Sequence, residues 1–193
     1  PYTTLFRSGV RLNKWIADSG FCSRREADRL ISEKKVTIDG RTGELGDKVM
    51  PGMKVCVNGK PVRRQQHKVY IALNKPEGVV CTADPREPMN VVDYVGHPER
   101  IFPIGRLDKD SSGLLLMTND GEIVNRILRA AGKHEKEYVV TVNKPITPDF
   151  LERMAGGVEI LDTVTLPCRI TQEDRFTFRI VLVQGLNRQI RRM

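Results

Sequence analysis

The segment 105–121 constrains the fold of this chain more than any other. A turn rich in Asp, Ser and Gly, residues 105–113, leads directly into an apolar run, residues 114–117. Such a turn keeps polar side chains at the surface, while the apolar run after it must be buried as a strand. Asp108 stands in this turn, two residues after Arg106. A carboxylate beside a cation can stay ionised and face a substrate; an ordinary surface salt bridge is the alternative.

The composition is that of a globular protein with one full core and a small additional domain. Its 193 residues are 39% hydrophobic and 29% charged, and no apolar run approaches the roughly 20 residues that span a bilayer. The four cysteines are far apart, which argues against a zinc site or a disulfide framework and suggests a reducing cytoplasm. We expect them to pack as small hydrophobic side chains. They are Cys22, Cys56, Cys81 and Cys168.

The net charge of +8 is concentrated in the first third of the chain. Residues 9–68 contain 14 Lys or Arg against 7 Asp or Glu, whereas residues 69–193 contain 17 of each and Arg7 supplies the remaining charge. This asymmetry predicts a polyanion-binding module attached to an electrostatically balanced domain. A solvated basic face without a partner is the alternative.

Both ends of the chain indicate that the sequence is not a complete native protein. Residues 1–8 join poorly to the residues after them and resemble the translation of a sequencing adapter, so we expect a non-native leader; a disordered native leader is the alternative. Residues 187–193 hold a cap and barely one helical turn, which is marginal without packing. We therefore expect the catalytic part to be incomplete at its C-terminus.

Local patterns predict short helices and strands in the first third. A helix is expected over 10–17. Ser23 is expected to cap a second helix, because Ser23-Arg24-Arg25-Glu26 is an S-x-x-E capping box. In such a box the side chains of Ser23 and Glu26 each bond the backbone N–H of the other residue. Strands are expected at 36–38 and 55–57, each with a turn after it, Asp39-Gly40 and Asn58-Gly59. The polar, basic stretch 60–68 is expected to be a linker.

Beyond the linker, strands and helices mix without a strict βαβ rhythm, which favours an α+β fold. A helix is expected to start after Asp120-Gly121 and to cover Ile123, Val124, Ile127 and Leu128. A second helix is expected from Thr147-Pro148-Asp149, which supplies a cap, a first-position Pro and an early acid. The remaining expected elements are strands at 69–73, 137–142 and 176–183.

Four motifs in order carry a resemblance to a known family. The four motifs are Asn74-Lys75-Pro76-x-Gly78, the 105–121 segment, Lys136-Glu137-Tyr138 and Asn187-Arg188-Gln189-Ile190-Arg191. Together they resemble the motifs of the RsuA/RluB/RluE/RluF family of pseudouridine synthases. Residues 10–59, with Arg11-Leu12-Asn13-Lys14 and Ser23-Arg24-Arg25, are similar to the S-four-type (alpha-L) RNA-binding domain of such enzymes. The resemblance implies an S-four-type domain over 9–59, a linker over 60–68 and a mixed, mainly antiparallel-sheet catalytic domain over 69–193.

The resemblance also implies a function, the isomerisation of a uridine in 23S ribosomal RNA to pseudouridine. A transfer RNA is a further candidate substrate, and the implied protein is a cytoplasmic monomer that uses no metal or other cofactor and binds no membrane. The main alternative is a catalytically silent RNA-binding factor of ribosome assembly. A general nucleic-acid chaperone would explain the charge but not the 105–121 motif.

The family's catalytic residues map onto four positions. Asp108 would be the nucleophile or base at the junction of sugar and base. Arg191 would keep it anionic in a desolvated pocket, a phosphate contact being the alternative. Tyr138 would stack on the target uracil, unless it is a core tyrosine with a satisfied hydroxyl. Arg106 would fill the space left by the flipped nucleotide or hold its backbone.

The remaining predicted site residues would bind RNA, largely through phosphates and shape. One departure from the family pattern is the turn Glu33-Lys34-Lys35, where glycine is usual. A lysine in a left-handed cap costs about 1 kcal/mol relative to glycine, so either an added phosphate contact offsets the cost or the turn differs. Lys75 would also lie in a rigid turn with Pro76 and Gly78 beneath the site. The predicted RNA-binding residues are Arg11, Lys14, Ser23, Arg24, Arg25 and Lys75.

Overall fold

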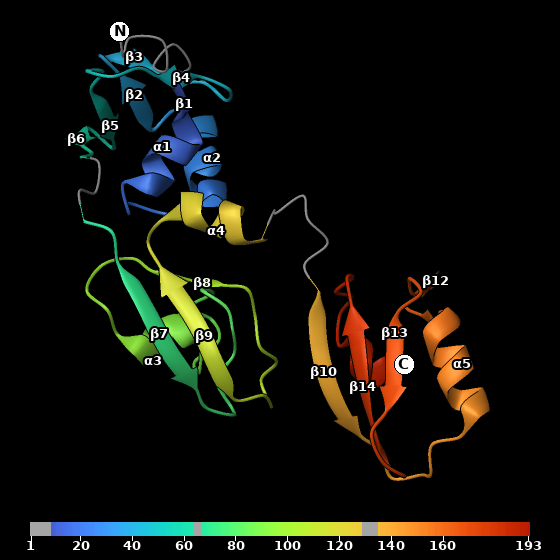
Figure 1. The fold of residues 1–193 in the computed structure, drawn as a ribbon. Coiled ribbons are helices and arrows are strands. Elements are labelled where there is room, and N and C mark those ends of the chain that lie inside the picture. The colour runs from blue at the N-terminus through green and yellow to red at the C-terminus, as the bar shows by residue number, and fades with distance from the viewer. Residues whose placement is uncertain (1–8, 64–66, 129–134) are drawn as a thin grey trace, which may run out of the picture. The chain divides into compact units, whose positions relative to one another are not determined.

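The computed structural model describes residues 9–63, 67–128 and 135–193, so the predicted leader lies outside the described residues. The chain divides between residues 128 and 129 into two compact units, each of which is described by itself (Figure 1). Short helices and antiparallel strands make up both units, as expected for an α+β fold. None of the helices within the described ranges is long and apolar enough to cross a membrane.

The front of the first unit packs two helices against small sheets. Helix α1 (Leu12–Asp18) and helix α2 (Arg24–Ser32) bury one face each, and residues such as Ile16, Ala27 and Val36 are fully enclosed between helices and sheet. The strands form a four-stranded sheet of order β3-β2-β5-β6 and a separate β1-β4 pair. Their bounds are β1 Val10–Arg11, β2 Val36–Ile38, β3 Arg41–Thr42, β4 Lys48–Val49, β5 Val55–Val57 and β6 Lys60–Pro61.

Most local signals in this region are confirmed. Strands β2 and β5 have the predicted bounds, and the turns after them hold Asp39 and Asn58 at positive φ, each with glycine next in the chain. The predicted linker is wrong at its start because β6 pairs with β5, and residues 64–66 of that stretch lie outside the described ranges. The observed helix α1 starts two residues later than predicted, because the first two residues of the predicted range form β1.

The capping box at the start of α2 is half formed. The Glu26 backbone N–H donates to the Ser23 hydroxyl at 3.2 Å, as predicted. The Glu26 carboxylate instead accepts two hydrogen bonds from the Arg29 guanidinium and does not reach back to Ser23. At the other end of α2, Lys34 has φ of +56°, so the turn keeps the left-handed geometry although it carries lysine in place of glycine.

The second part of the first unit is a three-stranded antiparallel sheet of order β7-β9-β8 with two helices (Figure 1). In β9, Leu115 and Met117 are buried whereas Leu114 and Leu116 are exposed. The expectation that the whole apolar run is buried was therefore wrong for alternate residues, because side chains alternate between the two faces of a strand. The elements are β7 Tyr70–Lys75, α3 Val91–Val95, β8 Phe102–Ile104, β9 Gly113–Thr118 and α4 Gly121–Leu128.

Helix α4 begins where predicted but does not bury all of its apolar residues. Ile123 and Val124 are half-buried, whereas Ile127 and Leu128 are exposed. The predicted helix is confirmed, because α4 covers all four of these apolar residues.

The second unit is a three-stranded antiparallel sheet of order β10-β14-β13 against which α5 packs. The predicted start of α5 is confirmed, because the Phe150 backbone N–H donates to the Thr147 hydroxyl. Phe178, Ile180 and Leu182 of β14 alternate toward the core. The elements are β10 Lys136–Thr141, α5 Pro148–Gly156, β11 Glu159–Ile160, β12 Thr163–Val164, β13 Arg169–Gln172, β14 Thr177–Leu182 and α6 Gln189–Arg192.

The cysteines pack as small hydrophobic residues, as predicted. All four thiols are unpaired, and three of them join the apolar clusters of the protein: Cys22, Cys81 and Cys168. In the described part of the chain, no group of three or more His, Cys, Asp or Glu side chains is placed to hold a metal ion.

Candidate active site

Asp108 lies in the turn between β8 and β9, at the place where the chain leaves the surface for the core. Gly105 and Gly113 bound this turn with φ of +80° and +131°, values that glycine adopts without strain. The Ser111 backbone N–H donates to the Asp108 carbonyl at 3.1 Å and tightens the turn. The Asp108 side chain is half-buried, as expected for a carboxylate that is held in place but still reached by a substrate.

The turn is fastened from inside by Lys75, the last residue of β7. The Lys75 side chain is fully buried, and its ammonium group donates to three backbone carbonyls, those of Pro76 at 2.7 Å, Ser111 at 2.6 Å and Lys109 at 3.4 Å. An ammonium group has three donors, so every one of them is used within the protein. The structure thus contradicts the predicted contact of Lys75 with RNA, because no part of this side chain reaches the surface.

The role of residues 74–78 as a rigid turn beneath the site is supported by two further contacts. The Gly78 backbone N–H donates to the Lys109 carbonyl at 2.8 Å, and Gly78 itself has φ of +87°. On the other side of Asp108, the Leu107 backbone N–H lies 3.3 Å from the Cys81 sulfur, a buried atom. Contacts on both sides of Asp108 therefore connect the turn to the segment that comes after β7.

Arg106 is exposed and forms no ion pair with any residue in the described ranges. The surface salt bridge within Arg106-x-Asp108, which was the alternative explanation of this motif, is therefore not formed. The Arg106 guanidinium remains available for a contact outside the protein.

Tyr138 lies in β10, the edge strand of the second unit's sheet, opposite Ile180 of β14. Its side chain is 39% exposed, and no hydrogen bond of its hydroxyl occurs within the described part of the chain. A core tyrosine would be enclosed and would satisfy its hydroxyl. The exposed ring instead offers a flat face at the edge of the sheet.

Arg191 lies on α6, a single turn whose exposed side includes both Arg191 and Arg192. The turn is anchored by Ile190 and Met193, which pack on the core of the second unit, and by Gln189, whose buried side chain accepts from the Leu186 N–H. Packing thus holds a turn that is too short to persist alone. Its N-cap is Arg188, in left-handed conformation, although the sequence pattern suggested a conventional cap.

The four predicted catalytic residues are divided between the two units. Asp108 and Arg106 belong to the first, and Tyr138 and Arg191 to the second. The pairing of Asp108 with Arg191 joins residues of different units and stays a prediction.

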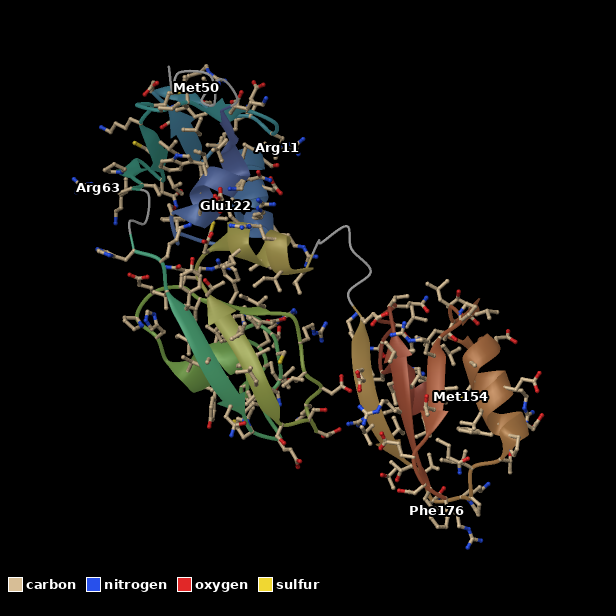
Figure 2. All side chains as sticks on the ribbon, in the orientation of Figure 1. Arg11, Met50, Arg63, Glu122, Met154 and Phe176 are labelled. Carbon is tan, nitrogen blue, oxygen red and sulfur yellow. The ribbon has the colours of Figure 1, made fainter. Side chains whose placement is uncertain are left out.

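The basic residues predicted to bind RNA differ in how free they are. Arg11, Arg24 and Arg25 are exposed, and none forms an ion pair with the described residues; Arg11 precedes α1 directly (Figure 2). Ser23 is half-buried, and its hydroxyl caps α2. Lys14 is engaged within the protein.

Lys14 connects the front domain to the start of α4. Its ammonium group lies 2.5 Å from the Asp18 carboxylate and 3.4 Å from that of Glu122. Each of these contacts competes with a phosphate for the same charge, so the structure gives Lys14 a role at this junction that the sequence pattern did not suggest. The i, i+4 spacing of Lys14 and Asp18 was the signal that could have found the first contact.

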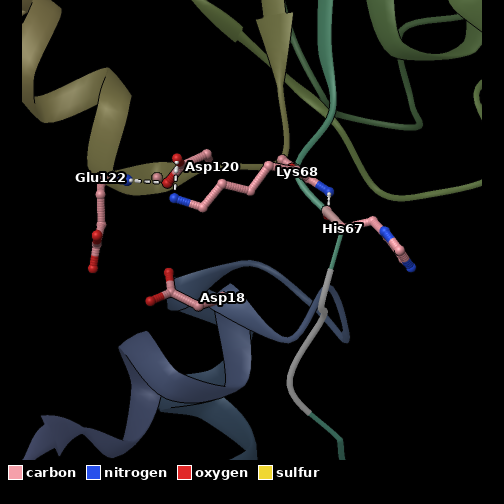
Figure 3. Close-up of a pocket in the computed structure, with 7 residues that line it drawn as sticks. Asp18, His67, Lys68, Asp120 and Glu122 are labelled. Carbon is pink, nitrogen blue, oxygen red and sulfur yellow. Dashed lines mark hydrogen bonds and ion pairs between the residues drawn. The ribbon is translucent and has the colours of Figure 1, made fainter.

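A further ion pair, between Lys68 and Asp120, lies close to Asp18 and Glu122 (Figure 3). The Lys68 ammonium group lies 2.8 Å from the Asp120 carboxylate, which also accepts from the Tyr70 hydroxyl at 3.0 Å and from the Glu122 backbone N–H. Burial raises the pKa of Asp120, but the hydrogen bonds from Lys68, Glu122 and Tyr70 outweigh it and leave the pKa below its ordinary value. Asp120 therefore stays anionic at the start of α4.

Comparison with known proteins identifies the two parts of the chain. The model of the RNA pseudouridylate synthase family matches residues 69–193, and the S4 domain model matches residues 10–55. The chain belongs to the RNA pseudouridylate synthase family.

Relatives within this synthase family cover nearly the whole chain. The dual-specificity RNA pseudouridine synthase RluF of Escherichia coli (strain K12) is 57% identical over 96% of the chain. Ribosomal large subunit pseudouridine synthase B of Bacillus subtilis (strain 168) is 38% identical over 95% of the chain and 78% of that protein. The chain spans 65% of the length of the RluF sequence.

A solved synthase structure supports the fold as well. The crystal structure of a pseudouridylate synthase matches 95% of the chain and 81% of its own length with a TM-score of 0.59 and 25% identity. The predicted order of domains, an S4 domain and then a mixed, mainly antiparallel synthase domain, is confirmed.

Proposed function

We propose that the protein isomerises a uridine of 23S ribosomal RNA to pseudouridine, with Asp108 as the catalytic nucleophile or base. The observation that carries the proposal is the Asp108 turn before strand β9, in which the fully buried Lys75 binds two backbone carbonyls and Asp108 itself is half-buried. The 57% identity to RluF over 96% of the chain supports the same reaction.

The reaction requires few chemical groups, but the group that acts on the reacting atoms must be held firmly in position. The bond between C1′ of the ribose and N1 of uracil breaks, a bond between C1′ and C5 forms, the hydrogen on C5 leaves as a proton, and N1 takes up a proton. No electrons and no other atoms are exchanged with a partner molecule, so the reaction does not require a redox group. A carboxylate such as Asp108 can act covalently at this junction, on either the ribose or the ring.

The other predicted site residues have roles consistent with this chemistry. The exposed ring of Tyr138 would stack on the flipped uracil, since a flat aromatic face accepts a base without reading its edge. The unpaired Arg106 would hold the RNA at the vacated position. Arg191, on the exposed side of α6, would be the counter-ion of Asp108.

The front domain would supply affinity for RNA. The exposed and unpaired Arg11, Arg24 and Arg25 would contact phosphates. The concentration of positive charge in this domain, beside an electrostatically neutral catalytic domain, supports this role. Ribosomal RNA as the partner also makes the cytoplasm the expected location, and we propose a monomer as the active state.

Tritium release tests the proposal directly. The full-length protein is incubated with 23S ribosomal RNA that carries tritium at C5 of its uridines, because each isomerisation liberates one label to water. We expect the wild-type protein to release tritium and Asp108→Asn to be slower by at least about 10³-fold, as for the loss of a group that acts on the reacting atoms. Equal release from both proteins would show that Asp108 is not the catalytic group, whereas no release from either would favour the catalytically silent assembly factor.

A transfer RNA is the proposed second substrate. RluF is named a dual-specificity synthase, and a turn that holds Asp108 without reading a base is compatible with more than one RNA. The same assay with labelled transfer RNA tests this; release from ribosomal RNA alone would limit the protein to one substrate.

A further inference from the structure

A cavity lies within the first unit where the S4 domain packs against the synthase domain. It has a volume of about 250 Å³ and is adjacent to the pocket at Lys68 and Asp120 that Figure 3 shows, with which it shares Asp18, Asn119 and Gly121. Two arginines line it, Arg24 from the first turn of α2 and Arg100 from the segment before β8. The two cations are 76 positions apart in the sequence and come from different domains.

Arg100 is held in place but has no counter-ion. Its guanidinium carbon lies 5.9 Å from the centroid of the Phe102 ring, a stacked arrangement that fixes the orientation of the side chain. The residue is half-buried, and no carboxylate within the described ranges pairs with it. Burial lowers the pKa of Arg100 below its ordinary value, yet an arginine stays charged in proteins. A partly desolvated charge of this kind is stabilised when an anion binds.

Arg24 is also without an ion pair in the described part of the chain, and it is exposed. The one acidic side chain that lines the cavity is Asp18, whose carboxylate is bound by Lys14 at 2.5 Å. Lys14 therefore offsets the charge of Asp18, and the two guanidinium groups leave the cavity positive. Planar guanidinium groups that form no ion pair within the described residues match the geometry of phosphate oxygens.

We propose that this cavity binds a phosphate of the RNA backbone, held jointly by Arg24 of the S4 domain and Arg100 of the synthase domain. The proposal rests on the proposed function, since it takes RNA as the substrate. It adds a contact in the synthase domain that no motif of the sequence indicated, and it means that both domains bind the same phosphate. The S4 domain would then position RNA relative to the catalytic domain as well as add affinity.

Salt-dependent binding measures the contact. The full-length protein is titrated with a 23S ribosomal RNA transcript between about 50 and 200 mM salt, where each phosphate contact contributes about 0.7 to 0.9 to the slope of log affinity against log salt. We expect Arg100→Gln to weaken binding about 3- to 10-fold and to reduce the slope by about one contact. Arg100→Lys, which keeps the charge, should restore most of the slope.

The double variant tests whether the phosphate is shared. Because residues that hold one group are coupled, Arg24→Gln with Arg100→Gln should weaken binding by clearly less than the product of the two single effects. A full product would show two separate phosphates and overturn the shared site.

Arg175 provides the matched control. Its guanidinium carbon lies 5.3 Å from the centroid of the Phe176 ring in the second unit, so Arg175→Gln removes a similarly stacked arginine that lines no described cavity. We expect this variant to bind like the wild type. If Arg100→Gln binds with the affinity and slope of Arg175→Gln, with thermal melts showing both variants folded, the inference fails while tritium release from the wild type leaves the proposed function intact. Absence of any binding by the wild type would overturn both.

Discussion

The Asp108 turn and the Tyr138 edge of β10 place their functional residues in opposite ways. Around Asp108, backbone groups are tied down by a buried side chain, Lys75, and by hydrogen bonds to the residues after β7. Tyr138 stands on an edge strand with a partly exposed ring and a hydroxyl that bonds nothing within the described ranges. The carboxylate therefore depends on preorganised backbone, whereas the aromatic residue contributes only its surface.

Among the variants that test this comparison, the largest effect should come from Lys75, which supports the turn. Lys75→Met keeps the length of the side chain but removes every donor, and it leaves three carbonyls without their ammonium partner. We expect the free energy of unfolding to fall by about 3 kcal/mol, because unsatisfied buried groups cost about 1 to 3 kcal/mol each. We also expect kcat for tritium release, measured well below the melting temperature, to fall about 10- to 100-fold, since a displacement of about 1 Å can cost that much.

The exposed Lys109 of the same turn is the control for this variant. Lys109→Met removes an outward side chain and should change neither stability nor kcat appreciably. If Lys75→Met lost stability but kept a normal kcat, Lys75 would only hold the fold and would not position Asp108. A KM that rose while kcat stayed constant would point the same way.

An intermediate effect is expected at Tyr138, and it separates the ring from its hydroxyl. Tyr138→Leu should lower kcat/KM about 10- to 100-fold, because stacking on a base is worth about 1 to 3 kcal/mol. Tyr138→Phe should stay within about threefold of the wild type, since the hydroxyl has no partner in the described ranges. Equal losses in the two variants would mean that the hydroxyl acts and that the contrast between the two regions is wrong.

The smallest effect is expected in the exposed turn that follows α2. Lys34 holds φ of +56° in this turn, directly after the C-cap residue Glu33. Lys34→Gly should stabilise the S4 domain by about 0.5 to 1 kcal/mol, because glycine adopts this backbone without steric cost. Denaturant unfolding of the S4 domain measures the gain. Lys35→Gly, at a position with ordinary backbone, should give no gain, and equal gains would mean that backbone strain is not the cause.

Much of the fold could be predicted because its signals are local. The cap of α2 at Ser23, the Asn58-Gly59 turn and the alternation along β14 each depend on neighbours a few residues away. The α4 helix was predicted from the same kind of pattern, but the exposure of Ile127 and Leu128 was not, since periodicity marks an apolar face without saying what covers it.

The candidate site was predicted less completely because its supports are distant in sequence. The acceptors of Lys75 are backbone carbonyls up to 36 positions away. Because every residue has a backbone carbonyl, the residue type does not indicate which one accepts a hydrogen bond. The contact of Lys14 with Glu122 spans 108 positions. Arg100 matches no motif, and only the tertiary structure brings it to the cavity beside Arg24. Residue type thus indicated the candidate reacting groups, whereas the contacts that hold them in place became visible only in the tertiary structure.

The enclosure of Lys75 gives the protein a built-in chemical reporter. An amine that is fully covered reacts with an acylating or methylating reagent only when the backbone around it opens, whereas exposed amines such as that of Lys109 react at once. The rate at which Lys75 becomes labelled is therefore tied to how often the Asp108 turn comes apart. The lifetime of the closed Asp108 turn could therefore be measured by mass spectrometry of the labelled Lys75 side chain.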